Sequence, residues 1–396
     1  MRSPCLEVAD IVRMHGDEFL DGQPGWFTYQ HLTVYRAITA CRTQALGGHL
    51  DQCSQCGYRA ISYCSCRNRH CPKCQTNARN KWLAARSKEL LDVGYFHVVF
   101  TLPHQFSGLA LQNKRVIYDL LFRTCAETLL EVAAAPSTWA PRSVSSPFCI
   151  HGDRICSLIP HIHCVIPSGG LSPDHTAWVH PRYHFFLPVE VLSRVFRGKF
   201  TDALKRAFRK GKLVFHGRLR CLSNAKMFRI FLRSVFPHDW VVYAKEPFGG
   251  PEHVLHYLAR YTHRVAISNH RLISLEDGKV TFRWKDYAHG NKQRKMTVGS
   301  DEFLRRFFLH VLPRGFVRIR FFGFLANRSR ANMLPLCRRL LEMPSRDPMA
   351  AVPVADARPP AGWKCPCCSG SMVMIGTLTA RQLRWMAFEQ NTVDTS

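Results

Sequence analysis

Two closely spaced cysteine pairs lie near the N-terminal end of this 396-residue chain. Cys53 and Cys56 form the first pair, and Cys71 and Cys74 form the second. A Cys-x2-Cys turn presents two thiolates to one ion, and two such turns complete the tetrahedron that structural Zn²⁺ prefers. The spacing therefore predicts one zinc site made by these four residues. The alternative is a loop of reduced thiols, which would have few apolar side chains to keep residues 49–76 folded.

Other cysteine and histidine residues leave the ligand set of this module open. Cys64, Cys66 and His70 lie between the two pairs, where each could replace a ligand or help to bind a second ion. Near the C-terminal end, the run Cys-Pro-Cys-Cys at 365–368 has the spacing of half a zinc site, but the sequence does not indicate the other half. Seventeen cysteines without an export signal predict a reducing, cytoplasmic setting, in which paired thiols bind metals.

A histidine pair and a tyrosine pair could carry out a different chemistry. His161 and His163 are two residues apart on an apolar segment, so in a strand both imidazoles face one side and can bind one divalent ion. Tyr257 and Tyr261 are four residues apart, so on a helix their hydroxyl groups share a face. A bound ion can polarise a phosphodiester, and a tyrosine hydroxyl can attack it to form a covalent intermediate. Taken alone, each pair also fits ordinary packing in a core.

Strands and helices of moderate length must position these residues. Apolar runs predict buried strands at 95–101 and 161–166, and alternation around Asp277-Gly278 predicts a hairpin over 271–284. Helical spacing is found at 28–46, 77–91, 108–131, 189–209, 223–235 and 251–262. Helices mixed with an antiparallel hairpin indicate an α+β fold.

Several sequence stretches, taken in order, resemble one known family. These are CRTQALGGH, SCRNRHCPKCQ, YFHVVFTLPH, PHIHCVIPSGGL, YLARYTHRVAIS, FRWKDYAHG and EFLRRFFLHVLPRGFVRIR. They cover most of the chain and resemble the bacterial rolling-circle insertion-sequence transposases of the His-hydrophobe-His (HUH), two-tyrosine class, the IS91 group. The resemblance implies an HUH-type antiparallel sheet with flanking helices, preceded by a helical, zinc-ribbon-like module.

The resemblance also implies roles for individual residues. It implies that His161 and His163 bind Mg²⁺ or Mn²⁺. It implies that Tyr257 and Tyr261 cleave single-stranded DNA, leaving a 5′-phosphotyrosine and a free 3′-hydroxyl group. It further implies that the two cysteine pairs bind zinc. The domains expected are an N-terminal helical and zinc-binding domain at 1–91, an HUH catalytic domain at 92–335, and a linker with a cysteine-containing tail at 336–396.

Basic residues run along the whole chain. Fifty-five Lys and Arg face 28 Asp and Glu, which leaves a formal net charge of +27. Such an excess suits a polyanion, because each neutralised phosphate releases a counterion. The resemblance implies that this polyanion is single-stranded DNA and the transposon ends. The candidate DNA contacts are Arg67, Arg69, Lys73, Arg260, Arg264, Arg318 and Arg320. No run of about 18 apolar residues is found, so we expect no membrane span. The resemblance implies a bacterial, cytoplasmic protein that is associated with the nucleoid when it acts.

Residues 134–159 depart from the family pattern, which has a strand resembling KHLGAEIGFLAVLHTWGQNL there. Codons for 137–143 and for 150–155, moved by one nucleotide, can encode KHLGAEI and HTWGQN. The segment is therefore interpreted as frame-shifted, with one insertion or deletion near codons 133–136 and a compensating one near codons 159–161. Prolines at 136, 141, 147 and 160 predict a loop here, which would leave the histidine strand without a neighbour on one side.

Three functions follow from these patterns. The first is an active transposase that makes and rejoins single-strand breaks. The second is a zinc-dependent DNA-binding remnant, in which the shifted segment has disabled the catalytic sheet. The third is a nickase of the replication-initiator or relaxase type, which the N-terminal cysteine module disfavours.

Overall fold

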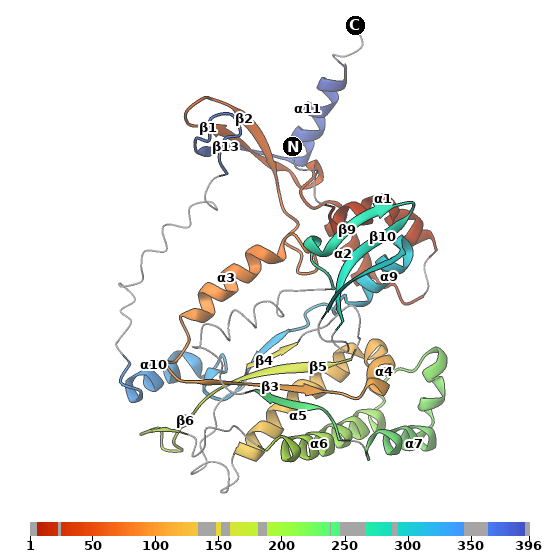
Figure 1. The fold of residues 1–396 in the computed structure, drawn as a ribbon, viewed down its shortest axis with the longest axis vertical. Helices are drawn as coiled ribbons and strands as arrows, with labels where there is room; N and C mark the ends of the chain where they lie inside the picture. Colours follow the sequence, from red (N-terminus) through yellow and green to blue (C-terminus); the bar gives the residue numbers. More distant parts are fainter. Residues whose placement is uncertain are drawn as a thin grey trace. The chain divides into compact units, whose positions relative to one another are not determined.

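The structure is a computed structural model that describes residues 6–22, 25–133, 148–151, 159–180, 188–237, 239–245, 266–286, 292–343 and 363–392. The chain forms two units, each built from separate stretches of sequence (Figure 1). Unit 1 comprises 1–75, 268–305 and 346–396, and unit 2 comprises 76–267 and 306–345. These units differ from the predicted domains, because the C-terminal tail and the segment 268–305 belong with the N-terminal region.

Two helices, α1 (Val8–Asp21) and α2 (Tyr29–Thr39), begin unit 1. Apolar residues at helical spacing face the interior, so that Ile11 and Ile38 are fully buried. Gly16 allows the helices to approach closely, because a Cβ there would lie 2.5 Å from the ring of Tyr35. A short 3₁₀ turn, η1 (Gln44–Leu46), then leads into the first sheet.

This first sheet is antiparallel and joins the two ends of the sequence. Its central strand β1 (Gly48–Cys53) pairs with β2 (Arg59–Tyr63) on one side and with β13 (Met372–Leu378) on the other. Gly47 enters β1 with φ +74°, and a Cβ there would lie 2.6 Å from the carbonyl oxygen of Leu378. Only glycine fits this close approach without strain. Helix α11 (Ala380–Thr392) follows β13.

A second sheet of unit 1 contains the predicted hairpin. Strand β10 (Lys279–Asp286) pairs antiparallel with β9 (Leu272–Glu276) and with β11 (Lys292–Gly299), and the 3₁₀ turn η4 (Asn269–Arg271) precedes β9. Asp277 and Gly278 have φ +47° and +67°, the left-handed backbone of a two-residue type I′ turn. The hairpin prediction is confirmed. Helix α9 (Ser300–Leu309) follows β11.

Unit 2 is built on a five-stranded antiparallel sheet with the order β12-β4-β5-β3-β8. The strands are β3 (Tyr95–Thr101), β4 (Phe148–His151), β5 (His161–Pro167), β8 (Val242–Lys245) and β12 (Ile319–Phe321). Both predicted buried strands, 95–101 and 161–166, are confirmed as β3 and β5. Antiparallel sheets together with helices also confirm the α+β fold class.

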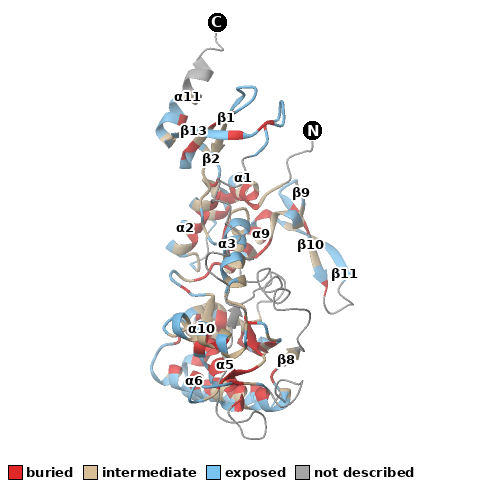
Figure 2. Ribbon diagram, turned by 90° about the vertical axis from the view of Figure 1, so that its left-hand side faces the viewer, coloured by how far each residue is buried: buried red, intermediate tan, exposed pale blue. Residues whose placement is uncertain are grey.

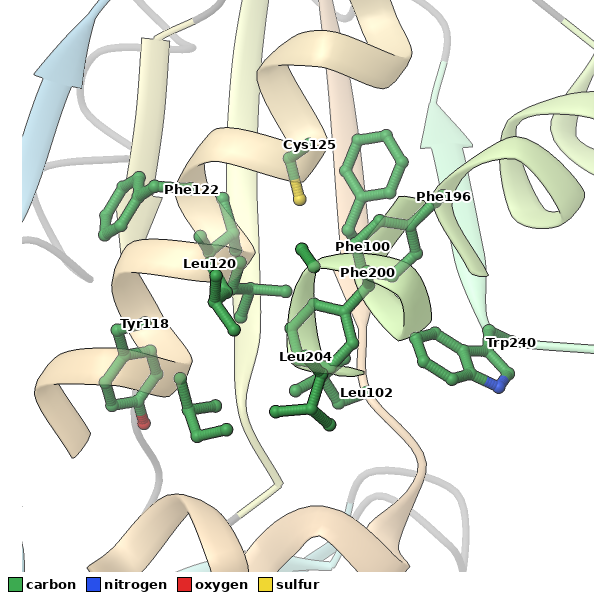
Figure 3. Close-up of a cluster of buried hydrophobic side chains, with 14 of the residues drawn as sticks. Phe100, Leu102, Tyr118, Leu120, Phe122, Cys125, Phe196, Phe200, Leu204 and Trp240 are labelled. Carbon is green, nitrogen blue, oxygen red and sulfur yellow. The ribbon is translucent and has the colours of Figure 1, made fainter. Parts of the chain in front are cut away.

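One face of this sheet carries the main apolar core. Phe96, Val98 and Phe100 alternate along β3 and pack with helices α5 (Lys114–Ala133) and α6 (Val189–Arg209). Figure 3 shows Phe100 beside Phe196 and Phe200 of α6, with Trp240 at the edge of the cluster. The centroids of the Phe100 and Phe196 rings lie 5.0 Å apart. The predicted helix at 189–209 matches α6.

The remaining elements are helices and short strands around these sheets. They are α3 (Gln75–Ser87), η2 (His104–Phe106), α4 (Ser107–Gln112), β6 (Gly170–Leu171), β7 (Trp178–Val179), η3 (Gly217–Ser223), α7 (Ala225–Val235), η5 (Gly323–Leu325) and α10 (Arg330–Leu340). Among the described residues, no helix is both long and apolar enough to cross a membrane.

Strand β4 corrects one prediction about the segment 134–159. It pairs with β5 on one side and with β12 on the other, so the histidine strand has a neighbour on both sides. The prediction of a loop that leaves β5 unpaired is therefore wrong. The physical reason is local, because Pro147 precedes the strand and proline removes a ladder hydrogen bond only at its own position. The rest of the segment, 134–147 and 152–158, lies outside the described residues.

Candidate metal centres and nucleic-acid contacts

Eight cysteines of unit 1 gather in two clusters of four. In each cluster the four sulfur atoms all lie within 4.8 Å of one another. The first cysteine cluster consists of Cys41, Cys66, Cys71 and Cys74. The second cysteine cluster consists of Cys53, Cys56, Cys365 and Cys368.

The first cysteine cluster joins the end of α2 to the start of α3. Cys41 follows α2, Cys66 lies in the loop after β2, and Cys71 and Cys74 lie just before α3. The Sγ atom of Cys41 is 3.5 Å from that of Cys74 and 3.7 Å from that of Cys71, and Sγ of Cys66 is 3.6 Å from that of Cys74. Cys41 and Cys71 are almost completely buried. The cluster therefore forms the interior of this loop region.

These distances fit a tetrahedral zinc site. With Zn–S bonds of about 2.3 Å, tetrahedral geometry places neighbouring sulfur atoms about 3.8 Å apart. Disulfide bonds need a separation of about 2.05 Å, and the thiols of both clusters are free. The side chain of Cys66, followed by that of Cys71, stabilises the charged form of Cys41 and lowers the pKa of its thiol, and the same contacts with Cys41 raise the pKa of the Cys66 and Cys71 thiols. Thiolate is the form in which cysteine binds metals.

The two clusters correct the predicted ligand grouping. The sequence indicated one site with Cys53, Cys56, Cys71 and Cys74, but the structure divides these residues between two clusters. The reason is that the turn after β1 carries the first pair, whereas the second pair lies beside the end of α2. Cys41 was missed, because it stands outside any close pair. Cys66 was among the open alternatives, whereas Cys64 lies 3.8 Å from Nε2 of His49 and outside both clusters.

The HUH pair lies on β5, whose two faces differ. Ile162 and Cys164 point into the apolar core and are fully buried. His161 and His163 lie on the opposite face, as strand alternation requires, with ring centroids 5.2 Å apart. Nδ1 of His161 donates to the carbonyl oxygen of Ile159 at 2.9 Å. Nε2 is then the nitrogen with which His161 would bind an ion.

A third histidine, His97 of β3, lies on the same face and contacts His163. Nε2 of His97 is 2.9 Å from Nδ1 of His163, and the two ring planes differ by only 4°. Both side chains are nearly buried, at 3% and 4% exposure. This contact orients the His163 ring, so that its Nε2 would be the ligand atom. The sequence alone does not indicate His97, because its contact with His163 depends on β3 and β5 being neighbours in the sheet.

The predicted tyrosine nucleophiles lie outside the described residues. Tyr257 and Tyr261, together with Arg260 and Arg264, belong to residues 246–265. Their positions relative to the histidines remain a prediction.

The predicted DNA contacts near the first cysteine cluster have different surroundings. Arg67 and Arg69 are exposed in the loop between Cys66 and Cys71. Lys73 forms an ion pair with Glu7, with Nζ 2.6 Å from the carboxylate oxygen. A phosphate would have to compete with that carboxylate, so Arg67 is a better candidate for DNA contact than Lys73.

Two other predicted contacts lie at β12, with Arg318 just before the strand and Arg320 within it. Arg320 forms an ion pair with Asp119, and its guanidinium lies 4.4 Å from the ring centroid of Phe122. Arg318 is half-buried. These partners give Arg320 a role in packing, which the sequence alone does not indicate.

Comparison with known proteins identifies the family. The family described as "Putative transposase" matches residues 151–332, and the family described as "Transposase zinc-binding domain" matches residues 11–102. A "Putative transposase" of Sinorhizobium fredii (strain NBRC 101917 / NGR234) is 52% identical over 338 residues, which cover 85% of this chain and 84% of that protein. This chain belongs to the IS91 group of transposases.

A second relative of this transposase is more distant. The transposase for insertion sequence element IS801 of Pseudomonas savastanoi pv. phaseolicola is 27% identical over 314 residues, which cover 78% of this chain and 74% of that protein. No solved structure matches the chain.

The two family matches cover the candidate centres of this transposase unequally. The transposase match includes His161 and His163. The zinc-binding match includes the whole first cysteine cluster, and together with the sulfur geometry it supports Zn²⁺ there. The same match includes Cys53 and Cys56 but ends far before the C-terminal half of the second cysteine cluster.

Proposed function

We propose that this transposase breaks and rejoins single-stranded DNA at transposon ends through 5′-phosphotyrosine intermediates, in a rolling-circle mechanism. The histidine face of β5 is the observation that carries the proposal. Two imidazoles lie on one side of the strand, each with Nδ1 engaged by a neighbour. Two Nε2 atoms on a buried, paired strand form a rigid half-site for one Mg²⁺ or Mn²⁺ ion. Membership of the transposase family supports DNA as the substrate.

The chemistry assigns separate tasks to the histidines and the tyrosines. When bound, the divalent ion would polarise the scissile phosphodiester. The hydroxyl oxygen of Tyr257 or Tyr261 attacks phosphorus, the bond from phosphorus to the 3′ oxygen breaks, and a proton passes to the 3′ oxygen as the tyrosine gives up its own. The phosphotyrosine keeps the energy of the broken bond, so a 3′-hydroxyl group can reverse the step without ATP. Two tyrosines allow two successive transfers.

His97 acts in this proposal as a positioning residue for His163. Its contact with Nδ1 fixes the orientation of the His163 ring, and loss of such a partner lowers metal affinity or activity about 10- to 100-fold. His97→Gln, which retains a hydrogen-bonding group, should restore part of what His97→Ala loses. A purely structural role would change stability in both variants without raising the Mn²⁺ concentration needed for half-maximal cleavage.

A cleavage assay on single-stranded DNA tests the proposed function. The wild-type chain with Mg²⁺ or Mn²⁺ should form a covalent protein–DNA adduct, and Tyr257→Phe combined with Tyr261→Phe should abolish it. His161→Ala should abolish the adduct through loss of the metal half-site. An adduct in the double tyrosine variant would show that other residues are the nucleophiles.

Two other functions compete with this proposal. A catalytically inactive DNA-binding remnant was expected if the shifted segment disabled the sheet, but the pairing of β4 with β5 and β12 favours the active enzyme. A nickase of the replication-initiator or relaxase type is disfavoured by the match to a transposase zinc-binding domain. Absence of any adduct from a folded, metal-loaded chain would favour the remnant.

A further inference from the structure

We infer that the second cysteine cluster is a zinc site that fastens the C-terminal segment of the chain onto the N-terminal sheet. Two of its ligands come from the turn after β1 and two from the turn before β13, more than 300 residues later in the sequence. The site does not depend on the catalytic proposal, because it lies within unit 1 and uses none of the predicted catalytic residues.

The sulfur geometry of this cluster fits zinc as well as that of the first one. Sγ of Cys53 lies 3.5 Å from that of Cys368, and Sγ of Cys56 lies 3.5 Å from that of Cys365. These separations are close to the value of about 3.8 Å that a tetrahedral Zn–S₄ site requires. They are much longer than the S–S bond of a disulfide. The contacts cross between the two turns, so one ion would hold both.

The two turns have the same backbone hydrogen bonds and the same position of a left-handed residue, which indicates that they are two halves of one metal site. In the N-terminal turn, the Cys53 N–H donates to the carbonyl of Tyr58 at 2.8 Å and the Gly57 N–H donates to that of Cys53 at 3.2 Å. The residue after the second cysteine, Gly57, has φ +75°.

The C-terminal turn repeats these features. The Cys365 N–H donates to the carbonyl of Gly370 at 2.8 Å, and the Ser369 N–H donates to that of Cys365 at 2.9 Å. Ser369, the residue after the second cysteine, has φ +58°. A left-handed serine carries a backbone cost, which is readily explained if the turn must present two thiolates to one ion.

The close fit between the two turns leaves little room for change. A Cβ on Gly370 would lie 2.7 Å from Oε1 of Gln55 and 3.1 Å from Sγ of Cys53. The Ser54 N–H donates to the carbonyl of Ser371 at 3.0 Å, and the indole N–H of Trp363 donates to the buried Asp51 of β1 at 3.0 Å. The C-terminal segment is therefore seated on β1 by specific contacts on both sides of the cysteine turn.

The surrounding sheet has few apolar side chains that could hold it together without a metal. The buried cluster here consists of Cys53, Cys365 and Met372, with Ala60 packed against it. Val373 and Ile375 of β13 are about half exposed, at 51% and 50%. A small sheet with such a core needs another source of stability, and thiolate–zinc bonds supply it.

Metal content measured by mass spectrometry tests this inference. Reduced, purified full-length chain should contain two zinc ions, one for each cysteine cluster. Cys365→Ser combined with Cys368→Ser should remove one ion, and Cys41→Ser combined with Cys66→Ser should remove the other. Cys367→Ser is the matched control, because this exposed thiol belongs to neither cluster, and it should retain both ions.

A second substitution distinguishes loss of a zinc ligand from misfolding. Cys368→His replaces one zinc ligand with another, so it should retain two zinc ions, whereas Cys368→Ser should lose one. Exchange with Co²⁺ should give the wild-type chain twice the thiolate-to-cobalt absorption of the Cys365→Ser, Cys368→Ser variant. Zinc content unchanged in that double variant, or equal loss in the serine and histidine variants of Cys368, would overturn the inference.

Discussion

The two sheets that carry the candidate metal ligands are stabilised in different ways. The five-stranded sheet of unit 2 packs Phe100 and its neighbours against α5 and α6, and its core is formed by large apolar side chains (Figure 3). The sheet of β13, β1 and β2 is mostly intermediate or exposed (Figure 2), and the small buried cluster beside it consists of Cys53, Cys365 and Met372. Hydrophobic burial therefore holds the histidines in place, whereas metal binding would hold the two ends of the chain together.

Of the predicted effects, removal of zinc should reveal the largest difference in stability between the sheet of β13, β1 and β2 and the five-stranded sheet of unit 2. Structural zinc sites contribute on the order of 10 kcal/mol to the folding of small domains, so a chelator under reducing conditions should unfold the sheet of β13, β1 and β2. Hydrogen exchange should accelerate at the amides of Ser54 and Cys365, which are bonded across or within the turns. The amides of β3 and β5 should keep their protection.

The same experiment can contradict the comparison. Equal loss of protection in both sheets would mean that zinc stabilises the whole chain. Unchanged protection at Ser54 after complete zinc removal would mean that the N-terminal sheet does not need a metal.

Truncation of a side chain in the apolar core should destabilise unit 2 and leave the zinc sites of unit 1 unchanged. Phe200 of α6 is fully buried, and Phe200→Ala should lower the free energy of unfolding of unit 2 by about 3–5 kcal/mol. Zinc content should remain that of the wild-type chain, because both cysteine clusters lie in unit 1. Val241→Ala, at a side chain that is 64% exposed, should change stability by only about 0.5 kcal/mol or less. Chemical denaturation followed by fluorescence measures both.

A glycine substitution tests how closely β13 is seated on β1. Gly47→Ala adds a Cβ that would lie 2.6 Å from the carbonyl oxygen of Leu378, at φ +74°. This should destabilise the N-terminal sheet by about 1–3 kcal/mol. Gly376→Ala is the control within the same sheet, because a Cβ there would meet nothing within 4 Å. Thermal unfolding that is equally affected by both substitutions would contradict the observed pairing.

The smallest effects should distinguish arginines that pack from arginines that bind DNA. Arg320→Lys should cost about 0.5–1 kcal/mol of stability, because it loses planar stacking on Phe122, and should leave DNA affinity unchanged. Arg67→Ala should leave stability unchanged and reduce the slope of log K against log salt by about 1. Fluorescence anisotropy with single-stranded DNA at several salt concentrations measures this difference. If Arg320→Lys lowered DNA affinity and left stability unchanged, Arg320 would be a DNA contact and not a packing residue.

Local pattern was sufficient to predict much of unit 2. Length and periodicity favour a single kind of secondary structure for each of three segments, the apolar runs at 95–101 and 161–166 and the helix at 189–209. All three elements are present in the structure. The HUH pair also occupies one strand face, since alternation depends only on the strand itself. His97 could not be found in this way, because its relation to His163 depends on which strands are neighbours.

The grouping of the cysteines in unit 1 could not be predicted, because it depends on residues that are far apart in the sequence. Close pairs such as Cys53 and Cys56 were recognised by their spacing, but spacing cannot show which pairs share an ion. The partners of that pair are more than 300 residues away, and Cys41 is a single cysteine at the end of a helix. Strand β4 was missed because prolines around it outweighed the short apolar run Phe148–His151.

Peptide mapping of the covalent adduct tests the proposed function most directly. The wild-type chain, incubated with single-stranded DNA that carries a transposon end and with Mn²⁺, should be digested and analysed by tandem mass spectrometry. We predict a nucleotide attached through its 5′-phosphate to Tyr257 or Tyr261. A nucleotide attached to any other residue, or through its 3′-phosphate, would contradict the account.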